Sequence, residues 1–131
     1  MKTILIVDDD ECFREMLRLS LENCGFNVRV AESAGEALEL VACCGIDAVL
    51  TDYQMPQTNG LQLCRALRDQ DRTFDRRLPV WVMTGSNALA ADEAIAAGAL
   101  GLFAKPFRTS EVAQILKTAL LADAANANVA P

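Results

Sequence analysis

The chain has 131 residues, of which 52% are hydrophobic and 23% charged, a length and composition that favour one folded domain around a single core. The formal net charge of −6 argues against a surface for nucleic acid, because binding to the phosphate backbone needs clustered lysine and arginine. No apolar stretch approaches the length of a membrane span and the N-terminus resembles no signal peptide, so we expect a cytoplasmic protein.

The first half of the chain predicts three strands and two helices. Short apolar runs rich in β-branched residues are typical of buried parallel strands, whereas apolar residues three or four apart indicate helices. Gly25 supplies a helix stop, and Ser33, three residues before Glu36, forms the capping-box pattern that begins a helix. In order, we expect a strand at 4–7, a helix at 11–24, a strand at 27–31, a helix from Ser33 to about Cys44 and a strand at 46–51.

The second half predicts two more strands and three more helices. The segment 53–59, which contains Pro56, is expected to form a loop, and the polar segment 69–78 is expected to be irregular. Gly98 should end an alanine-rich helix. The expected elements are a helix from Gly60 to about Arg68, a strand at 79–84, a helix at 88–97, a strand at 100–104 and a helix from Thr109 or Ser110 to about Leu121.

Five strands that alternate with five helices predict an α/β fold. Such a pattern forms one open parallel sheet, covered by helices on both faces and joined by right-handed crossovers. We expect residues 1–121 to form this single domain. The tail at 122–131 is rich in alanine and asparagine without an apolar period, so we expect it to be flexible.

Three aspartates directly follow two of the predicted strands. Asp8 and Asp9 come after the first strand, and Asp52 comes after the third. In an open α/β sheet the ligand site lies beyond the carboxyl ends of the strands, where these carboxylates would meet. Crowded carboxylates repel one another, so we expect a compensating cation, and oxygen ligands favour a hard ion such as Mg²⁺.

Two further polar residues lie at the ends of the remaining strands. Thr84 ends the fourth strand and Lys105 follows the fifth. Three acids, a hydroxyl and a cation at one edge of a sheet indicate a site that holds a metal ion and accepts an anion beside it. Singly, Lys105 could be a solvated lysine and Thr84 the cap of a turn. Asp10 is expected only to cap the helix that begins near Glu11.

Four motifs occupy these strand ends: Ile-Leu-Ile-Val-Asp-Asp-Asp at 4–10, Thr-Asp-Tyr-Gln-Met-Pro at 51–56, Met-Thr-Gly at 83–85 and Lys-Pro-Phe at 105–107. In this order and spacing they resemble the receiver domain of two-component response regulators, the CheY-like family. The resemblance covers residues 2–121. It implies the flavodoxin-like (βα)5 fold, a doubly wound sheet with strand order 2-1-3-4-5.

The resemblance also implies a role for each residue at the sheet edge. Asp52 would be the phosphoacceptor, Thr84 would donate its hydroxyl to the attached phosphoryl group, and Lys105 would pair with a phosphoryl oxygen. Similar domains hold the bond between Lys105 and Pro106 in the cis form. The implied ligands of Mg²⁺ are Asp8, Asp9, Asp52 and the backbone carbonyl of Gln54.

By this resemblance the protein is a phosphorylation-controlled signalling module. Because the chain has no histidine, it would receive its phosphoryl group from a histidine kinase, a phosphotransfer protein or a small acyl phosphate. The group would shift the conformation of the 84–107 face, through which the protein would bind a downstream target. It would be a monomer or a phosphorylation-dependent dimer. It would be no enzyme, but a phosphoacceptor that assists its own phosphorylation and dephosphorylation.

One position departs from the family pattern. Relatives couple the residue matching Thr84 to an aromatic switch residue three positions before the lysine, where this chain has Leu102. Leu102 can change its packing, but it has no ring or hydroxyl to move between solvent and core. We therefore expect signalling to rely more on movement of the 84–91 segment.

Three alternative functions stay open at this point. The chain could be the N-terminal receiver of a longer regulator. It could be a haloacid-dehalogenase-like phosphatase, because Asp8 and Asp10 have the Asp-x-Asp spacing of that class, although Asp52 would then lack a purpose. It could also be a degenerate receiver that serves only as a scaffold, against which the complete acceptor, metal and lysine positions argue.

We expect mainly structural roles for the cysteines and the large apolar residues of the chain. The absence of histidine removes most zinc sites and histidine-based catalysis. The five cysteines lack metal-ligand spacing, so we expect small buried hydrophobes in a reducing compartment, with a redox role left open for the adjacent Cys43 and Cys44. Trp81, Met83 and Phe103 are expected in the core.

Overall fold

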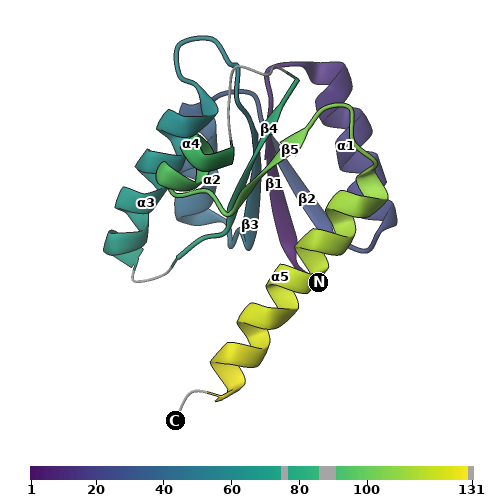
Figure 1. The fold of residues 1–131 in the computed structure, drawn as a ribbon, viewed down its shortest axis with the longest axis vertical. Helices are drawn as coiled ribbons and strands as arrows, with labels where there is room; N and C mark the ends of the chain where they lie inside the picture. Colours follow the sequence, from purple (N-terminus) through teal and green to yellow (C-terminus); the bar gives the residue numbers. More distant parts are fainter. Residues whose placement is uncertain (75–76, 86–90, 130–131) are drawn as a thin grey trace.

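The computed structural model describes residues 1–74, 77–85 and 91–129, in which five parallel strands form one sheet (Figure 1). The strand order is β2-β1-β3-β4-β5, which confirms the predicted flavodoxin-like arrangement. The strands are β1 (Thr3–Val7), β2 (Asn27–Ala31), β3 (Ala48–Asp52), β4 (Val80–Thr84) and β5 (Gly101–Ala104).

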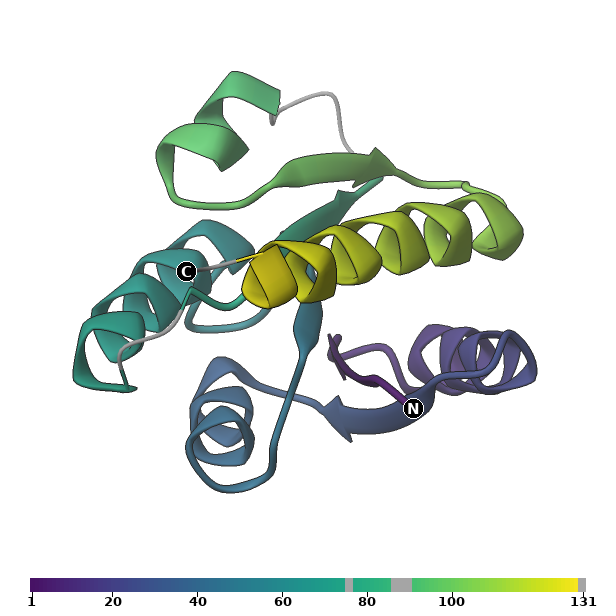
Figure 2. The same ribbon diagram turned by 90° about the horizontal axis from the view of Figure 1, so that it is seen from below.

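Helices cover both faces of the sheet, as Figure 2 shows from below. They are α1 (Glu11–Asn23), α2 (Ala34–Cys43), α3 (Gly60–Phe74), α4 (Ala91–Ala96) and α5 (Thr109–Val129). Buried side chains of α1 and α5 form one apolar cluster with the sheet, here named the α1–α5 layer. Those of α2, α3 and α4 form a second cluster on the opposite face, the α2–α3–α4 layer.

The burial of each strand follows from its place in the sheet. The central strands β1, β3 and β4 are covered on both faces, and their near-continuous apolar sequences are buried almost throughout. The edge strand β2 alternates between exposed and half-buried residues, and β5 is half-buried for most of its length. Trp81 and Met83 are buried in the α1–α5 layer, which confirms their predicted core positions, whereas Phe103 is half-buried and packs against this layer.

Capping residues begin the first two helices where the sequence predicts them. The side chain of Asp10 accepts hydrogen bonds from the backbone N–H groups of Cys12 and Phe13, at 3.1 and 3.3 Å. Ser33 Oγ accepts one from the N–H of Glu36 at 3.2 Å. Gly25, Gly45 and Gly98, which lie just beyond the ends of α1, α2 and α4, all have positive φ angles, the backbone region that glycine adopts most readily.

Two helices are longer than the sequence predicts. The expected end of α3 near Arg68 is wrong, because polar residues after it continue the helix to Phe74. There Arg68 pairs with Asp71 at 3.0 Å and donates to the carbonyl of Leu78, so this polar stretch ties the helix to the start of β4. The expected end of α5 near Leu121 is also wrong, since its alanine-rich continuation is helical to Val129.

The structure does not test two other predicted segment boundaries. Helix α4 is described from Ala91 to Ala96, and the expected start near residue 88 lies outside the described residues. The division into a domain at 1–121 and a flexible tail at 122–131 stays a prediction. Within the described segments, none of the helices combines the length and apolar character needed to cross a membrane.

The cysteines occupy several different environments, so the expectation of uniformly buried thiols is wrong. Cys64 is buried, and burial raises the pKa of its thiol to about 11. Cys12 is exposed and Cys24 is half-buried. Cys43 and Cys44 are joined by a disulfide bond at the end of α2.

Gly60, the first residue of α3, lies against the end of the strand that carries Asp52. A Cβ atom added at Gly60 would lie 2.5 Å from the backbone oxygen of Asp52 and 3.1 Å from Cα of Tyr53. We expect Gly60→Ala to lower the free energy of unfolding, measured by urea denaturation, by about 1–3 kcal/mol. In Gly35→Ala, where the added carbon meets nothing within 4 Å, stability should be unchanged or slightly raised. Equal stability of the two variants would contradict this close approach.

Candidate functional site

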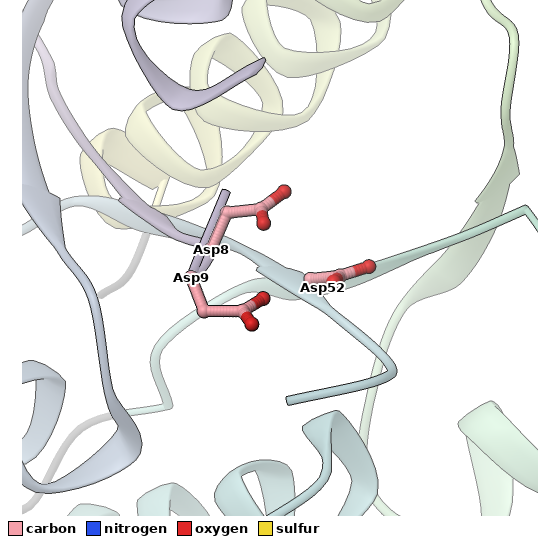
Figure 3. Close-up of side chains that lie close together, drawn as sticks. All are labelled: Asp8, Asp9 and Asp52. Carbon is pink, nitrogen blue, oxygen red and sulfur yellow. The ribbon is translucent and has the colours of Figure 1, made fainter. Parts of the chain in front are cut away.

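Three carboxylates converge at the carboxyl ends of the neighbouring strands β1 and β3 (Figure 3). In the parallel register Val7 lies opposite Thr51, so the residues that follow, Asp8 and Asp52, emerge side by side. Asp9 comes next to Asp8 on the same loop. One oxygen atom of each of the three aspartates lies within 4.8 Å of the others. The structure thus brings together the acids that the sequence predicts, here named the acidic cluster.

The loop that carries Asp8 is fixed by several hydrogen bonds. The side chain of Asp8 is 1% exposed, and its Oδ1 accepts a hydrogen bond from the N–H of Asp10 at 2.9 Å. Its backbone carbonyl accepts one from the guanidinium of Arg14 at 2.8 Å, and its N–H donates to the carbonyl of Ala31. The Asp52 side chain is 13% exposed, and Asp9 is exposed. The cluster therefore has a buried floor and one accessible carboxylate at its mouth.

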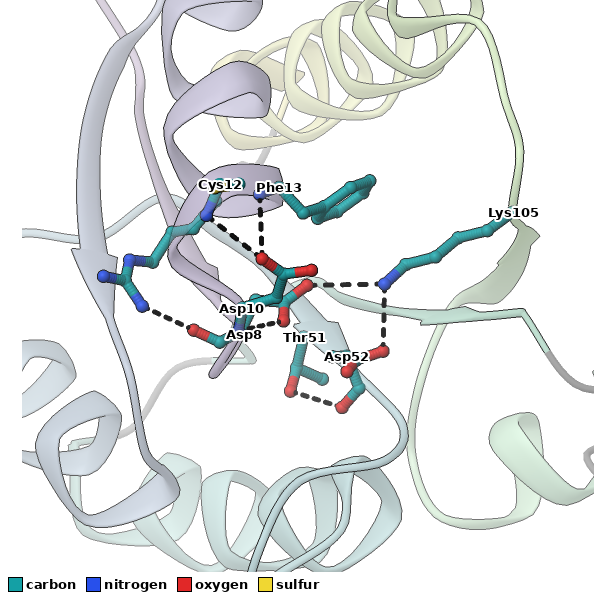
Figure 4. A network of polar contacts seen from close by, with 8 residues as sticks. Asp8, Asp10, Cys12, Phe13, Thr51, Asp52 and Lys105 are labelled. Atoms are coloured by element: carbon teal, nitrogen blue, oxygen red, sulfur yellow. Dashed lines mark hydrogen bonds and ion pairs between the residues drawn. The ribbon is translucent and has the colours of Figure 1, made fainter.

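Lys105 reaches the acidic cluster from the end of β5 (Figure 4). Thr84 pairs with Ala104 in the sheet register, and the N–H of Lys105 donates to the carbonyl of Thr84 at 2.7 Å. The ammonium Nζ lies 3.2 Å from Oδ1 of Asp52 and 3.4 Å from Oδ2 of Asp8. It therefore bridges two of the three carboxylates. The bond between Lys105 and Pro106 is cis, as the resemblance implies.

The electrostatics of the cluster favour a further cation. Burial raises the pKa of Asp52, and the negative charges of Asp8 and Asp9 raise it further, while the ammonium of Lys105 opposes both effects. With all three carboxylates ionised, three negative charges and one positive charge leave two negative charges uncompensated. An oxygen-only donor set of this charge suits a hard divalent ion.

The burial of the Asp52 carboxylate and its repulsion by Asp8 and Asp9 destabilise the folded protein when no metal is bound. We therefore predict that Asp52→Asn stabilises the metal-free fold. A carboxyl whose pKa is raised on folding binds its proton more tightly in the folded state, so stability falls as pH rises from the unfolded value through the raised value. At pH 7, in a chelating buffer, we expect the free energy of unfolding of Asp52→Asn to exceed that of the wild type. The difference should vanish below the unfolded pKa of aspartate.

The exposed Asp10 provides the control for this measurement. Asp10→Asn keeps an oxygen for the helix cap, so it should leave stability near the wild-type value. A wild type more stable than Asp52→Asn at pH 7 without metal would contradict the repulsion.

The remaining predicted site residues lie at the same edge of the sheet. Thr84 is buried, at 4% exposed, and ends β4 beside the strand that carries Asp52. Gln54 lies two residues after Asp52 with an exposed side chain, in a loop where the N–H of Tyr53 donates to the carbonyl of Met83. The hydroxyl role of Thr84 and the ligand role of the Gln54 carbonyl stay predictions.

One contact in the site was missed from the sequence. The ring of Phe13, in the first turn of α1, lies under Nζ of Lys105 at 4.0 Å from the ring centroid. In the sequence Phe13 is only one of several apolar residues at helical spacing. The one available signal was its place in the first turn, close to the sheet edge.

A comparison with known protein families identifies the family of this chain. The model of the response regulator receiver domain matches residues 4–117. The chain belongs to this family. It is a receiver domain of two-component signalling, and family membership implies a histidine kinase or phosphotransfer partner. This match sets aside the haloacid-dehalogenase-like alternative.

Curated relatives of this chain agree with the family match. The response regulator MprA of Mycolicibacterium vanbaalenii is 42% identical to this receiver over 110 residues, which are 83% of this chain and 46% of that protein. MprA of Mycobacterium ulcerans is 41% identical over the same lengths. The chain thus spans about half the length of these curated relatives.

Solved structures share the fold over nearly the whole chain. A putative response regulator from Chloroflexus aurantiacus is similar with a TM-score of 0.82 and 36% identity, covering 92% of this chain and 98% of that one. The chemotaxis protein CheY4 of Vibrio cholerae is similar with a TM-score of 0.81 and 28% identity, covering 90% and 98%.

Proposed function

We propose that Asp52 accepts a phosphoryl group from a phosphohistidine of a kinase or phosphotransfer protein, with Mg²⁺ bound at the acidic cluster. The observation that carries this proposal is the convergence of three carboxylates within 4.8 Å, two of them bridged by the ammonium of Lys105. Such a set offers a nucleophile, a metal site and a fixed positive charge at one point of the sheet edge.

The donor set fits magnesium in its chemistry. Asp8, Asp9 and Asp52 supply carboxylate oxygens, and the backbone carbonyl of Gln54 would add a fourth ligand. When bound, Mg²⁺ would offset the negative charge on the carboxylate and phosphoryl oxygens. The two uncompensated charges of the cluster supply the reason for a divalent ion.

The chain's own residues would then carry the transfer. A carboxylate oxygen of Asp52 forms a bond to phosphorus while the bond from phosphorus to the donor's imidazole nitrogen breaks, and the imidazole keeps that electron pair. Lys105, already 3.2 Å from Asp52, moves its ammonium onto a phosphoryl oxygen. Thr84 donates its hydroxyl to another. In this proposal the receiver is a phosphoacceptor that assists its own phosphorylation and dephosphorylation, and it is not itself an enzyme.

The signal would leave through the 84–107 face. Turning a two-state equilibrium from 1:99 to 99:1 needs about 5.5 kcal/mol of differential interaction, which a dianion beside Lys105 could supply. Leu102 is half-buried and packs against the α2–α3–α4 layer, so no aromatic ring is present at the usual switch position. Movement of the 84–91 segment stays the expected route, and residues 86–90 lie outside the described part of the chain.

A surface hollow of about 710 Å³ on this side is the expected contact for a downstream target. Its lining combines apolar side chains with one positive and one negative group. The lining residues are Leu102, Phe103, Ala104, Pro106, Phe107, Arg108 and Glu111.

The matched relatives are about twice as long as this chain. A second proposal is therefore that the chain is the N-terminal receiver of a longer regulator.

A direct test uses a small acyl phosphate as donor. We expect the intact mass to rise by about 80 daltons, one HPO₃ unit, when acetyl phosphate and Mg²⁺ are both present. Omitting Mg²⁺ or adding a chelator should prevent the gain. A protein that gains no mass with either acetyl phosphate or a set of histidine kinases would refute the proposal.

Asp9→Asn should weaken Mg²⁺ binding while the fold stays intact. Asp9 is the exposed member of the cluster, so its replacement removes a ligand charge without opening the core. We expect a dissociation constant at least about tenfold higher by titration calorimetry. Asp10→Asn removes the same charge one residue away and should bind Mg²⁺ with wild-type affinity. Equal affinities in the two variants would exclude Asp9 as a ligand.

A further inference from the structure

The ammonium of Lys105 has an aromatic neighbour besides its two carboxylates. Its Nζ lies 4.0 Å from the ring centroid of Phe13, a distance at which the face of a ring attracts a cation. Phe13 comes from the first turn of α1, whereas Lys105 comes from the end of β5. In Figure 4 the ring of Phe13 and the side chain of Lys105 point toward each other above Asp52.

The ring of Phe13 is held in place by other aromatic residues. The edge of one ring meets the face of the other between Phe13 and Phe107, with centroids 6.0 Å apart and planes at 80°. Phe107 contacts Phe103 at 6.0 Å, and Phe103 stacks on Trp81 at 6.2 Å. Trp81 is only 5% exposed. The position of the Phe13 ring is therefore fixed by a row that reaches into the α1–α5 layer.

This contact has a consequence for the lysine. A lysine side chain has a flexible four-carbon stem and loses much rotamer freedom when its head group is fixed. The two carboxylates attract the ammonium from one side, and the ring of Phe13 provides an attractive apolar surface beside it. Attraction to a ring face depends less on angle than a hydrogen bond does. The ammonium can therefore shift from carboxylate to phosphoryl oxygens while it stays in contact with the ring.

We propose that Phe13 is a positioning residue for the phosphorylation of Asp52, an inference that rests on the proposed function. Its ring face holds the Lys105 ammonium at the acidic cluster, ready for the incoming phosphoryl group. Phe13 itself touches neither the metal site nor the phosphoryl group. It acts only through Lys105.

The test compares Phe13→Leu and Phe13→Tyr with a matched control elsewhere in the chain. Phe26 also lies near a lysine, with Nζ of Lys117 at 5.9 Å from its ring centroid, but outside the acidic cluster. We expect Phe13→Leu to slow phosphorylation of Asp52 by acetyl phosphate about three- to fivefold, the factor expected for a lost cation–π contact. Phe13→Tyr should restore the wild-type rate, and Phe26→Leu should leave it unchanged. Mg²⁺ affinity should be the same in all four proteins.

A spectroscopic signature separates positioning from a general structural effect. In the wild type the ring current of Phe13 should shift the ε-methylene protons of Lys105 upfield, and the shift should disappear in Phe13→Leu. If Phe13→Leu does not fold, trifluorophenylalanine at position 13 keeps the ring shape but weakens its negative face, and it should slow phosphorylation similarly.

Three results would overturn the inference: wild-type rates in the leucine or fluorinated variant, an equal loss in Phe26→Leu, or no upfield shift in the wild type. Each of these leaves the wild-type phosphorylation intact, so it is distinct from a failure of the proposed function. That failure would instead appear as a wild-type protein that gains no phosphoryl group.

Discussion

Asp52→Asn is expected to gain no phosphoryl mass under conditions in which the wild-type receiver is fully loaded by acetyl phosphate and Mg²⁺. The amide of asparagine has no carboxylate oxygen to attack phosphorus, although it retains nearly the shape of the side chain. Asp52 is also the carboxylate nearest to Lys105, at 3.2 Å, and is more accessible than Asp8. Intact mass spectrometry, with the wild type shifted by about 80 daltons, measures the effect.

The Asp10→Asn variant is the control for this experiment. Asp10 is an exposed cap of α1 with a carboxylate close to the cluster in sequence, so its variant should load as the wild type does. Mass gain in Asp52→Asn, mapped by peptide analysis to Asp8 or Asp9, would show that the acceptor is a different member of the acidic cluster.

Lys105→Met should separate phosphoryl transfer from metal binding. Methionine keeps an apolar stem of similar length but removes the positive charge that bridges Asp8 and Asp52. We expect phosphorylation to slow by about a hundredfold, the order found when a preorganised charge-stabilising group is removed. Mg²⁺ affinity should be unchanged or higher, because the ammonium no longer competes for the same two carboxylates. Loading rates by mass spectrometry and titration calorimetry provide the two measurements.

A second lysine serves as the control for this variant. Lys117 lies on α5 near Phe26, away from the acidic cluster, so Lys117→Met should change neither rate nor affinity. Loss of Mg²⁺ binding in Lys105→Met would show that the lysine shapes the metal site itself. An unchanged loading rate would remove Lys105 from the transfer.

Most of the site could be predicted from the sequence because its residues directly follow the strands of the sheet. A buried parallel strand is recognisable from its continuous apolar run, and the residue that follows it is placed by the sheet. Asp8, Asp9, Asp52 and Lys105 therefore meet as the sequence predicts. The contact of Phe13 with Lys105 was not predictable, since it depends on the rotation of α1 against β5, two elements far apart in the chain.

Helix lengths were less predictable than strand order. The polar residues after Arg68 resemble a loop. The pair of Arg68 with Asp71 inside the helix, and the hydrogen bonds of both side chains to the backbone of Leu78, hold them in α3. At the end of α5 the sequence has no apolar period, but the intrinsic helix preference of alanine favours the continuation to Val129. Both errors have one cause: neither segment carries a periodic hydrophobic signal in its sequence.

The row of rings that ends at Trp81 also gives the receiver a built-in optical probe. Trp81 is the sole tryptophan of the chain, and it stacks on Phe103 with only 5% of its surface exposed. Indole fluorescence therefore originates from one known point beneath α5, with no second tryptophan to subtract. Changes of emission during phosphorylation would report on the α1–α5 layer without any attached dye.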